Sequence, residues 1–138
     1  QGDVYGQAGL GLAYEFVEGV VQDFTEAIIW YKRAAEQVYN RAQYSLGHLY
    51  HIGKGVEQNY DEAYRWHLKA ANQGYSESQY MLGVMYFNGE GVQKDFKKAR
   101  QWLYKAAMQG HYEASLADRL AYQHVIGSGI TPLFLPPP

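Results

Sequence analysis

The sequence predicts an all-α protein, an α-solenoid of helix-turn-helix repeats with a 36-residue period and about three and a half repeats. The first observation is an internal repeat, because one offset dominates when the 138-residue chain is aligned with itself. Matching residues recur at that offset: Trp30, Trp66 and Trp102; the Ala pairs 34–35, 70–71 and 106–107; and the Gly-Val pairs 19–20, 55–56 and 91–92. The second observation is that apolar residues within each unit recur every three or four positions, which is a helical spacing.

The first helix of each repeat is expected near 4–15, 40–51 and 76–87, followed by a capping helix at 112–124. In the second repeat, Ala42, Leu46 and Tyr50 recur at intervals of four. Asn40 and Gln43 match a capping box, in which each side chain satisfies a free backbone N–H group of the other residue.

The second helices are expected near 24–37, 60–73 and 96–109. Asp23 and Asn59 stand where an N-cap residue would begin the first two of them. Gly74 and Gly110 stand where a left-handed residue would end the second and third. The solenoid is therefore expected to comprise repeats at about 4–39, 40–75 and 76–111 within residues 1–124, followed by an extended Pro-rich tail at 125–138.

Small residues predict where the two helices of a repeat cross. Glycine in the middle of a helix costs about 1 kcal/mol relative to alanine, so its recurrence implies a close partner helix. The glycines are Gly11, Gly47 and Gly83, and the expected partner positions are Ala27, Ala63 and Ala99. The tryptophans are expected to fill the wider end of each crossing, so that Trp66→Ala would cost about 3–5 kcal/mol.

Composition excludes several classes of function. A formal net charge of −2 provides no basic excess to attract nucleic acid. No apolar run approaches the roughly 18–20 residues that a membrane span needs, and the start of the chain has neither a basic nor an apolar leader. The chain lacks an initiating Met and is expected to be a processed or excised form. Without cysteine, disulfide and thiolate chemistry are excluded and the redox compartment is left open.

Three patterns could carry chemistry, but each has a simpler structural interpretation. The Gly-x-Gly stretches at 53–55 and 89–91 precede helix starts, yet Asn59 and Asp95 are expected to cap those helices, so we interpret them as corners and not phosphate loops. His48 and His51 are three residues apart on one helix but lack a third metal ligand nearby. Ser45 lies one turn before His48 without an evident oxyanion hole. No catalytic residue, metal or cofactor is therefore predicted.

The repeat resembles a known family, the Sel1-like repeats, which are relatives of the tetratricopeptide repeat. The pattern A-x-x-x-L-G-x-x-Y-x-x-G-x-G-V, followed by D, A, W and AA-x-x-G, is present almost completely in AQYSLGHLYHIGKGVEQNYDEAYRWHLKAANQG at 42–74. It is equally complete in SQYMLGVMYFNGEGVQKDFKKARQWLYKAAMQG at 78–110. The first unit, at 6–38, departs by having Val17 and Val38 where the family has glycine.

This resemblance implies a right-handed superhelix in which first helices line the concave face and second helices the convex face. It also implies an adaptor or scaffold role in protein complexes. Many bacterial members are exported, so a periplasmic or secreted bacterial location is favoured over the cytoplasm. A few bacterial members are linked to β-lactam binding or hydrolysis, which is the alternative function.

The expected binding surface is the concave face, where apolar and aromatic residues would contact a peptide or partner protein. Arg41 and Glu77 would lie at its polar rim. For Tyr44 and Tyr80, burial as ordinary core between neighbouring helices is the alternative. The candidate partner-binding residues are Leu12, Phe16, Arg41, Tyr44, Ser45, His48, Ile52, Glu77, Tyr80, Met81, Val84, Phe87 and Asn88.

Two features concern the C-terminal end. Asp118 and Arg119 replace the Leu and Gly of the repeat and are expected to form a polar, solvent-exposed cap. The tail contains TPLFLPPP, which favours an extended backbone. We expect it to dock on its own solenoid end or on a second molecule, forming a homodimer, unless it is disordered or derived from a vector. More repeats before Gln1 are compatible with the sequence.

Overall fold

The computed structural model describes residues 3–16 and 23–127, apart from the side chain of residue 16. All of the secondary structure in these residues is helical, which confirms the predicted all-α class. The helices are α1 (Val4–Phe16), α2 (Phe24–Glu36), α3 (Asn40–Ile52), α4 (Tyr60–Asn72), α5 (Ser76–Asn88), α6 (Phe96–Met108) and α7 (Tyr112–Gly127). Helix α7 continues past the predicted end, so 125–127 are helical and not part of an extended tail. The predicted tail contacts at 128–138 lie outside the described residues.

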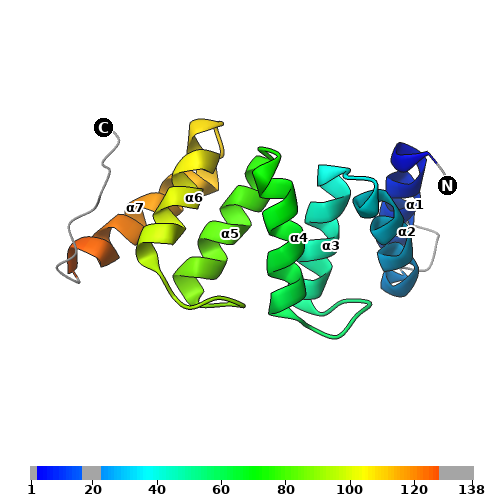
Figure 1. The fold of residues 1–138 in the computed structure, drawn as a ribbon, viewed down its shortest axis with the longest axis horizontal. Helices are drawn as coiled ribbons and strands as arrows, with labels where there is room; N and C mark the ends of the chain where they lie inside the picture. The colour runs from blue at the N-terminus through cyan, green and yellow to red at the C-terminus, as the bar shows by residue number, and fades with distance from the viewer. Residues whose placement is uncertain (1–2, 17–22, 128–138) are drawn as a thin grey trace. The chain divides into compact units, whose positions relative to one another are not determined.

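The chain divides into two compact units. The N-terminal unit, residues 1–75, contains α1 to α4, and each of these helices packs on the next. The C-terminal unit, residues 76–138, contains α5 to α7, where α6 packs on both of the others. Figure 1 shows the antiparallel helix pairs of each unit. The superhelix and a groove running along the whole chain stay predictions.

The second helices of the repeats begin with the predicted N-caps. In each case, the side chain of the cap residue accepts a hydrogen bond from the backbone N–H three residues later, at 3.0–3.1 Å. The three caps are Asp23, Asn59 and Asp95. These bonds occupy one of the free N–H groups at each helix start.

The capping box predicted for Asn40 and Gln43 is wrong. Helix α3 has no side-chain cap, and its N-cap residue is Tyr39. Gln43 is 3% exposed, and its amide lies between helices instead, where it donates to the Ala35 carbonyl at 3.2 Å and accepts from Gln73 at 2.8 Å.

The bond between Gln43 and Gln73 recurs once in every repeat. The side chain of the C-cap residue of each second helix donates to a glutamine of the first helix of the same repeat. The pairs are Gln37–Gln7 at 2.6 Å, Gln73–Gln43 at 2.8 Å and Gln109–Gln79 at 2.7 Å. This amide pair, which the sequence analysis missed, closes each helical hairpin at one end.

The second helices end in a left-handed residue, as predicted. Gly74 and Gly110 have φ values of +87° and +88°. The first repeat has Val38 at the same place, with φ +67°. Its N–H bonds to the Ala35 carbonyl at 3.0 Å, while that of Tyr39 bonds to the Ala34 carbonyl at 3.3 Å. The recurring Ala pairs thus supply the carbonyls that the turn requires.

The helices of a repeat meet at the residue after each tryptophan and not at the tryptophan itself. A Cβ atom placed on Gly47 would lie 2.9 Å from the His67 ring, and one on Gly83 would lie 2.5 Å from Leu103. Tyr31 takes the same place against Gly11. These three second-helix residues are at most 1% exposed, and the predicted Ala positions are fully buried as well.

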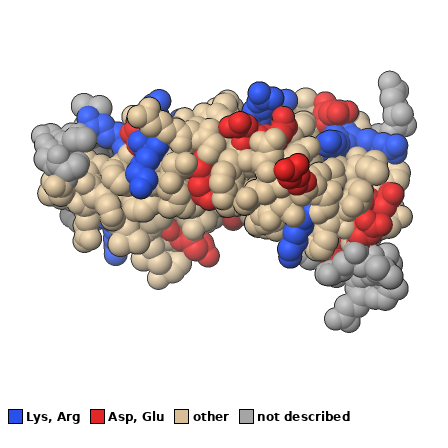
Figure 2. All heavy atoms as spheres, turned by 90° about the horizontal axis from the view of Figure 1, so that it is seen from below, with Lys and Arg blue, Asp and Glu red and all other residues tan. Residues whose placement is uncertain are grey.

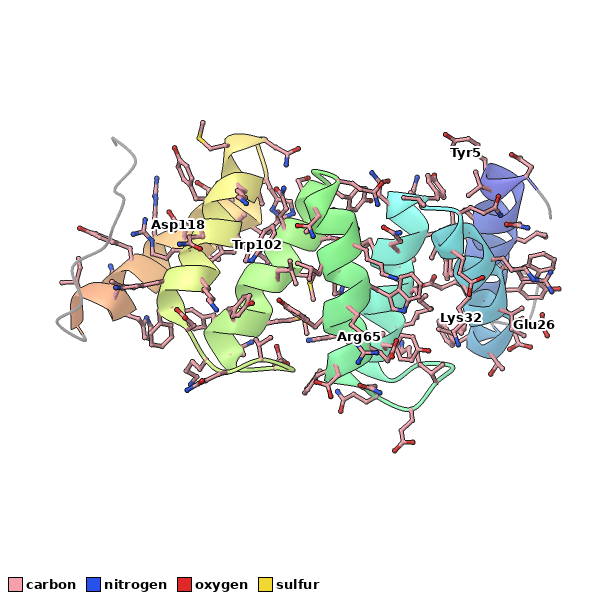
Figure 3. All side chains as sticks on the ribbon, viewed as in Figure 1. Tyr5, Glu26, Lys32, Arg65, Trp102 and Asp118 are labelled. Carbon is pink, nitrogen blue, oxygen red and sulfur yellow. The ribbon has the colours of Figure 1, made fainter. Side chains whose placement is uncertain are left out.

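The tryptophans are only half-buried, which corrects the prediction for Trp66. The ammonium group of Lys69 lies 4.5 Å from the centre of the Trp66 ring, and Lys105 covers Trp102 at the same distance. Figure 3 labels Trp102 on α6. The residue after each tryptophan faces the partner helix, and the tryptophan itself is left half-exposed. Truncating a half-exposed tryptophan removes fewer packing contacts, so we expect Trp66→Ala to cost less than the predicted 3–5 kcal/mol.

The polar end of the fold also differs from the prediction. Asp118, labelled on α7 in Figure 3, is only 9% exposed. Its carboxylate accepts from Nε of Arg100 on α6 at 2.8 Å, and the guanidinium lies 4.8 Å from the ring centre of Tyr122. Arg119 is exposed, as predicted. A buried ion pair therefore joins α6 to α7, at positions where the first repeats have Ile28 and Leu46.

Candidate functional site

The N-terminal unit contains a cavity of about 450 Å³ between α1 and α3. This volume is within the range of about 300–1,000 Å³ that is typical of ligand sites. Every predicted residue of this unit with a described side chain lines the cavity: Leu12, Arg41, Tyr44, Ser45, His48 and Ile52. The side chain of Phe16 lies outside the described part. Four lining residues were missed by the sequence analysis: Glu15, Phe24, Lys54 and Tyr75.

The buried side of the cavity is polar. Glu15 is 6% exposed, and its carboxylate accepts a hydrogen bond of 2.7 Å from the Tyr31 hydroxyl. Burial raises the pKa of Glu15, against the opposing effects of the Tyr31 bond and the positive charge of Lys54. Burial and Glu15 raise the pKa of Tyr31, so its phenol stays protonated and donates. The Ser45 side chain has a smaller, opposite effect and lowers the pKa of Tyr31.

The open side of the cavity carries two cations, Arg41 and Lys54, which are both exposed. The Lys54 ammonium lies 5.2 Å from the centre of the Phe24 ring. Glu15 is the only carboxylate among the lining residues that the structure describes, and burial favours its neutral form. The described lining is therefore positively charged whether or not Glu15 is ionised.

Tyr44 forms an aromatic wall of the cavity. Its ring centre lies 5.6 Å from that of Tyr75 and 6.2 Å from that of His48. Behind it, at 5.5 Å, is His67, which is fully buried. Tyr44 is half-buried, so it contributes to the packing and to the cavity surface together.

His67 stands where the other repeats have Tyr31 and Leu103, and it packs against the first helix of its repeat as they do. Neither of its ring nitrogens has a hydrogen-bond partner in the described structure. Burial, with smaller contributions from His51 and His48, lowers its pKa to about 3. The imidazole is consequently neutral at pH 7.

His48, His51 and Ser45 were considered from the sequence as parts of a metal site or of a nucleophile pair. Within residues 3–16 and 23–127, no group of three or more His, Cys, Asp or Glu residues is placed to hold a metal ion. The buried Nδ1 atom of His48 has no hydrogen-bond partner in the described structure, and therefore makes no bond to Ser45. Burial lowers the pKa of His48.

The predicted residues of the C-terminal unit lie on α5, and most of them are half-buried. Tyr80 stacks on His111 at 4.8 Å, and the His111 Nε2 atom lies 3.1 Å from a carboxylate oxygen of Glu77. Phe87 packs in an aromatic cluster with Phe96 at 5.1 Å and His124 at 5.0 Å. Met81 and Val84 are half-buried, and Asn88 is exposed.

The glycine-rich stretches are corners, as predicted. Gly53, Gly55, Gly89 and Gly91 all have φ values between +72° and +75°. A Cβ atom on Gly55 would lie 2.4 Å from the backbone of Phe24, so the corner packs directly against the start of α2. The corner thereby helps to place Phe24 and Lys54 beside the cavity.

On the face shown in Figure 2, acidic and basic side chains are interspersed among uncharged residues, and neither sign predominates there. None of the helices in the described part of the chain is long and apolar enough to cross a membrane.

Comparison with known proteins identifies relatives of the repeat. The family model of the Sel1 repeat matches residues 4–39, 40–75 and 76–111. A protective antigen of uropathogenic Escherichia coli that displays an SLR fold is 40% identical, with a TM-score of 0.84 over 92% of this chain and 27% of that one. A Sel1 repeat protein from Oxalobacter formigenes is 34% identical, with a TM-score of 0.84 over 94% of this chain and 53% of that one.

A third structure supports the fold alone. The Helicobacter pylori cysteine rich protein B is 22% identical, with a TM-score of 0.68 over 81% of this chain and 86% of that one. No curated protein sequence matches the chain significantly. The chain spans only 27% and 53% of the first two relatives.

Proposed function

The chain belongs to the Sel1 repeat family, and from this premise we propose that it is a non-catalytic module that binds a peptide or partner protein through its first helices. Proteins of this family are generally interaction modules. The observation that carries the proposal is the cavity between α1 and α3, where apolar, aromatic and charged side chains meet at the surface.

The residues at this cavity have the exposure that a binding surface needs. Ile52 is 40% exposed and Arg41 is exposed, so neither is committed to the core. Tyr44 supplies a large ring that already packs against Tyr75. The Tyr44 side chain therefore loses less conformational entropy when a partner binds. An aromatic anchor with a charged rim is the usual arrangement of an interaction hot spot.

The test is capture of a partner from a lysate of the source organism, followed by direct binding to the purified partner. We expect Arg41→Ala/Ile52→Asp to lose the partner. Arg65→Ala is the matched control, because Arg65 is exposed on α4 and does not line the cavity (Figure 3). Circular dichroism establishes that both variants are folded. Equal retention of the partner by both variants would contradict binding at this cavity.

The volume of the cavity supports small-molecule binding as a second candidate, of the β-lactam kind that the family resemblance suggests. Turnover of nitrocefin above a buffer blank, and its loss in Ser45→Ala, would favour an enzyme. We expect no turnover, because the Nδ1 atom of His48, one turn after Ser45 on α3, makes no hydrogen bond in the described structure that could activate the Ser45 hydroxyl.

A further inference from the structure

The chemistry of the cavity differs from that of the corresponding place in the C-terminal unit. The residue 72 positions after each cavity residue lies two repeats further along the chain. The helices α5 and α7 therefore correspond to α1 and α3. Glu15 corresponds to Phe87, Ser45 to Ala117, and His48 to Leu120. Arg41 corresponds to Glu113, which reverses the charge. The polar groups of the cavity are therefore not a requirement of the repeat fold.

The equivalent place is occupied by aromatic rings. Phe87, Phe96 and His124 pack with ring centres 5.0–5.1 Å apart. An apolar side chain thus suffices where the N-terminal unit has Glu15, a carboxyl group whose burial costs free energy unless it is hydrogen-bonded. In Glu15 that cost is offset by the Tyr31 hydroxyl.

Charge complementarity identifies the ligand. Two exposed cations line the cavity, and the only carboxylate among the lining residues that the structure describes is buried and already accepts from Tyr31. The opening thus offers donors and positive charge to an incoming group. The cavity is also lined by apolar and aromatic side chains. These are Leu12 on α1 and Tyr44 and Ile52 on α3.

We propose that this cavity binds the acidic side chain of an extended peptide segment, an Asp or Glu next to a large apolar residue. Arg41 and Lys54 contact the carboxylate, and the neighbouring apolar side chain packs on Tyr44 and Ile52. This inference rests on the proposed function and names the class of partner. A protein fits better than nucleic acid, because the net charge is −2 and acidic side chains are interspersed with basic ones on the face shown in Figure 2.

The experiment is selection of a phage-displayed library of random peptides on the immobilised full chain, followed by fluorescence polarisation with an amidated synthetic peptide of the enriched sequence. We expect enrichment of Asp or Glu beside an aromatic or aliphatic residue. Replacing that acid with its amide is expected to weaken binding at least about tenfold.

Two double variants localise the contact. Arg41→Gln/Lys54→Gln is expected to weaken binding at least about tenfold. Lys105→Gln/Arg119→Gln is the matched control, because it removes the same charge from exposed positions of the C-terminal unit and is expected to leave binding unchanged. Neutral replacements are chosen so that Glu15 does not acquire a new anionic neighbour.

The possible failures are distinguishable. Enriched peptides without an acidic residue, or equal binding by both double variants, would overturn the acidic-ligand proposal while the interaction function stands. Tighter binding of a single-stranded oligonucleotide than of the peptide, lost in Arg41→Gln/Lys54→Gln, would overturn the choice of a peptide. If no peptide is enriched and the purified partner from the capture experiment does not bind at this cavity, the proposed function fails as well.

Discussion

Replacing Val38 with glycine is expected to stabilise the protein by about 1 kcal/mol. Val38 ends α2 with φ +67°, in the left-handed region that a β-branched residue rarely adopts. Such a conformation costs about 1–3 kcal/mol. Gly74 and Gly110 occupy the equivalent positions at +87° and +88° without that cost.

The size of the effect follows from three contributions to the free energy of unfolding. Relief of the strain gains about 1–3 kcal/mol. The greater freedom of glycine in the unfolded chain takes back about 0.4–1 kcal/mol. Val38 is 63% exposed, so its loss removes only about 0.5 kcal/mol of burial. A net gain of about 1 kcal/mol remains, which corresponds to a rise in Tm of about 3–5 °C for a chain of this size.

The reverse substitution supplies the control. A Cβ atom on Gly74 would meet no other atom within 4 Å, so Gly74→Val tests the backbone conformation without a clash. It is expected to cost about 1 kcal/mol. Urea denaturation followed by circular dichroism measures both variants. A destabilised Val38→Gly, or a Gly74→Val variant as stable as the wild type, would refute the argument from backbone strain.

Three further predictions concern the core. His67→Leu is expected to raise stability at neutral pH and to flatten the pH dependence of stability. The folded pKa of His67, about 3, lies below the unfolded value near 6.5, so stability that is present above pH 6.5 is lost as the pH falls toward 3, with a loss of about 2 kcal/mol by pH 5. Urea titrations of both proteins at pH 5 and 8 measure this difference. Asp118→Leu alone is expected to cost about 3–5 kcal/mol by leaving the buried guanidinium without its carboxylate, while Arg100→Ile/Asp118→Leu is expected to be near neutral or stabilising; equal losses in thermal unfolding would contradict this. Leu103→Ala is expected to cost about 2–5 kcal/mol and Trp66→Ala less, because the Leu103 side chain is 1% exposed and the Trp66 side chain is half-buried. A larger loss of unfolding free energy for Trp66→Ala in chemical denaturation would contradict this description of the packing.

Much of the fold could be predicted because aligning the sequence with itself shows the 36-residue period of the repeat. The helix bounds, the N-caps such as Asn59 and the left-handed Gly74 each have local physical causes that a short stretch of sequence displays. The rotation of the second helices could not be predicted in this way. Trp66 and His67 follow the same period, so periodicity alone does not say which of them faces Gly47.

Partners distant in sequence were harder to predict. Asp118 looked like a surface residue because Arg100, its partner, lies on the preceding helix. The α3 residues of the cavity could be proposed from their positions along one helix face. Glu15 was missed although it lies on α1, because only the hydroxyl of Tyr31 explains a carboxylate at a buried position.

The amide pairs between helices have a consequence for how the length of such a protein can change. Each pair, such as Gln73 with Gln43, joins two residues 30 positions apart inside one 36-residue repeat. Inserting or deleting a whole repeat therefore adds or removes both glutamines of a pair together. No glutamine then loses its hydrogen-bond partner. Duplication and loss of complete repeats keep both residues of every pair, whereas a deletion that begins or ends between Gln43 and Gln73 removes one of them or changes the spacing between them.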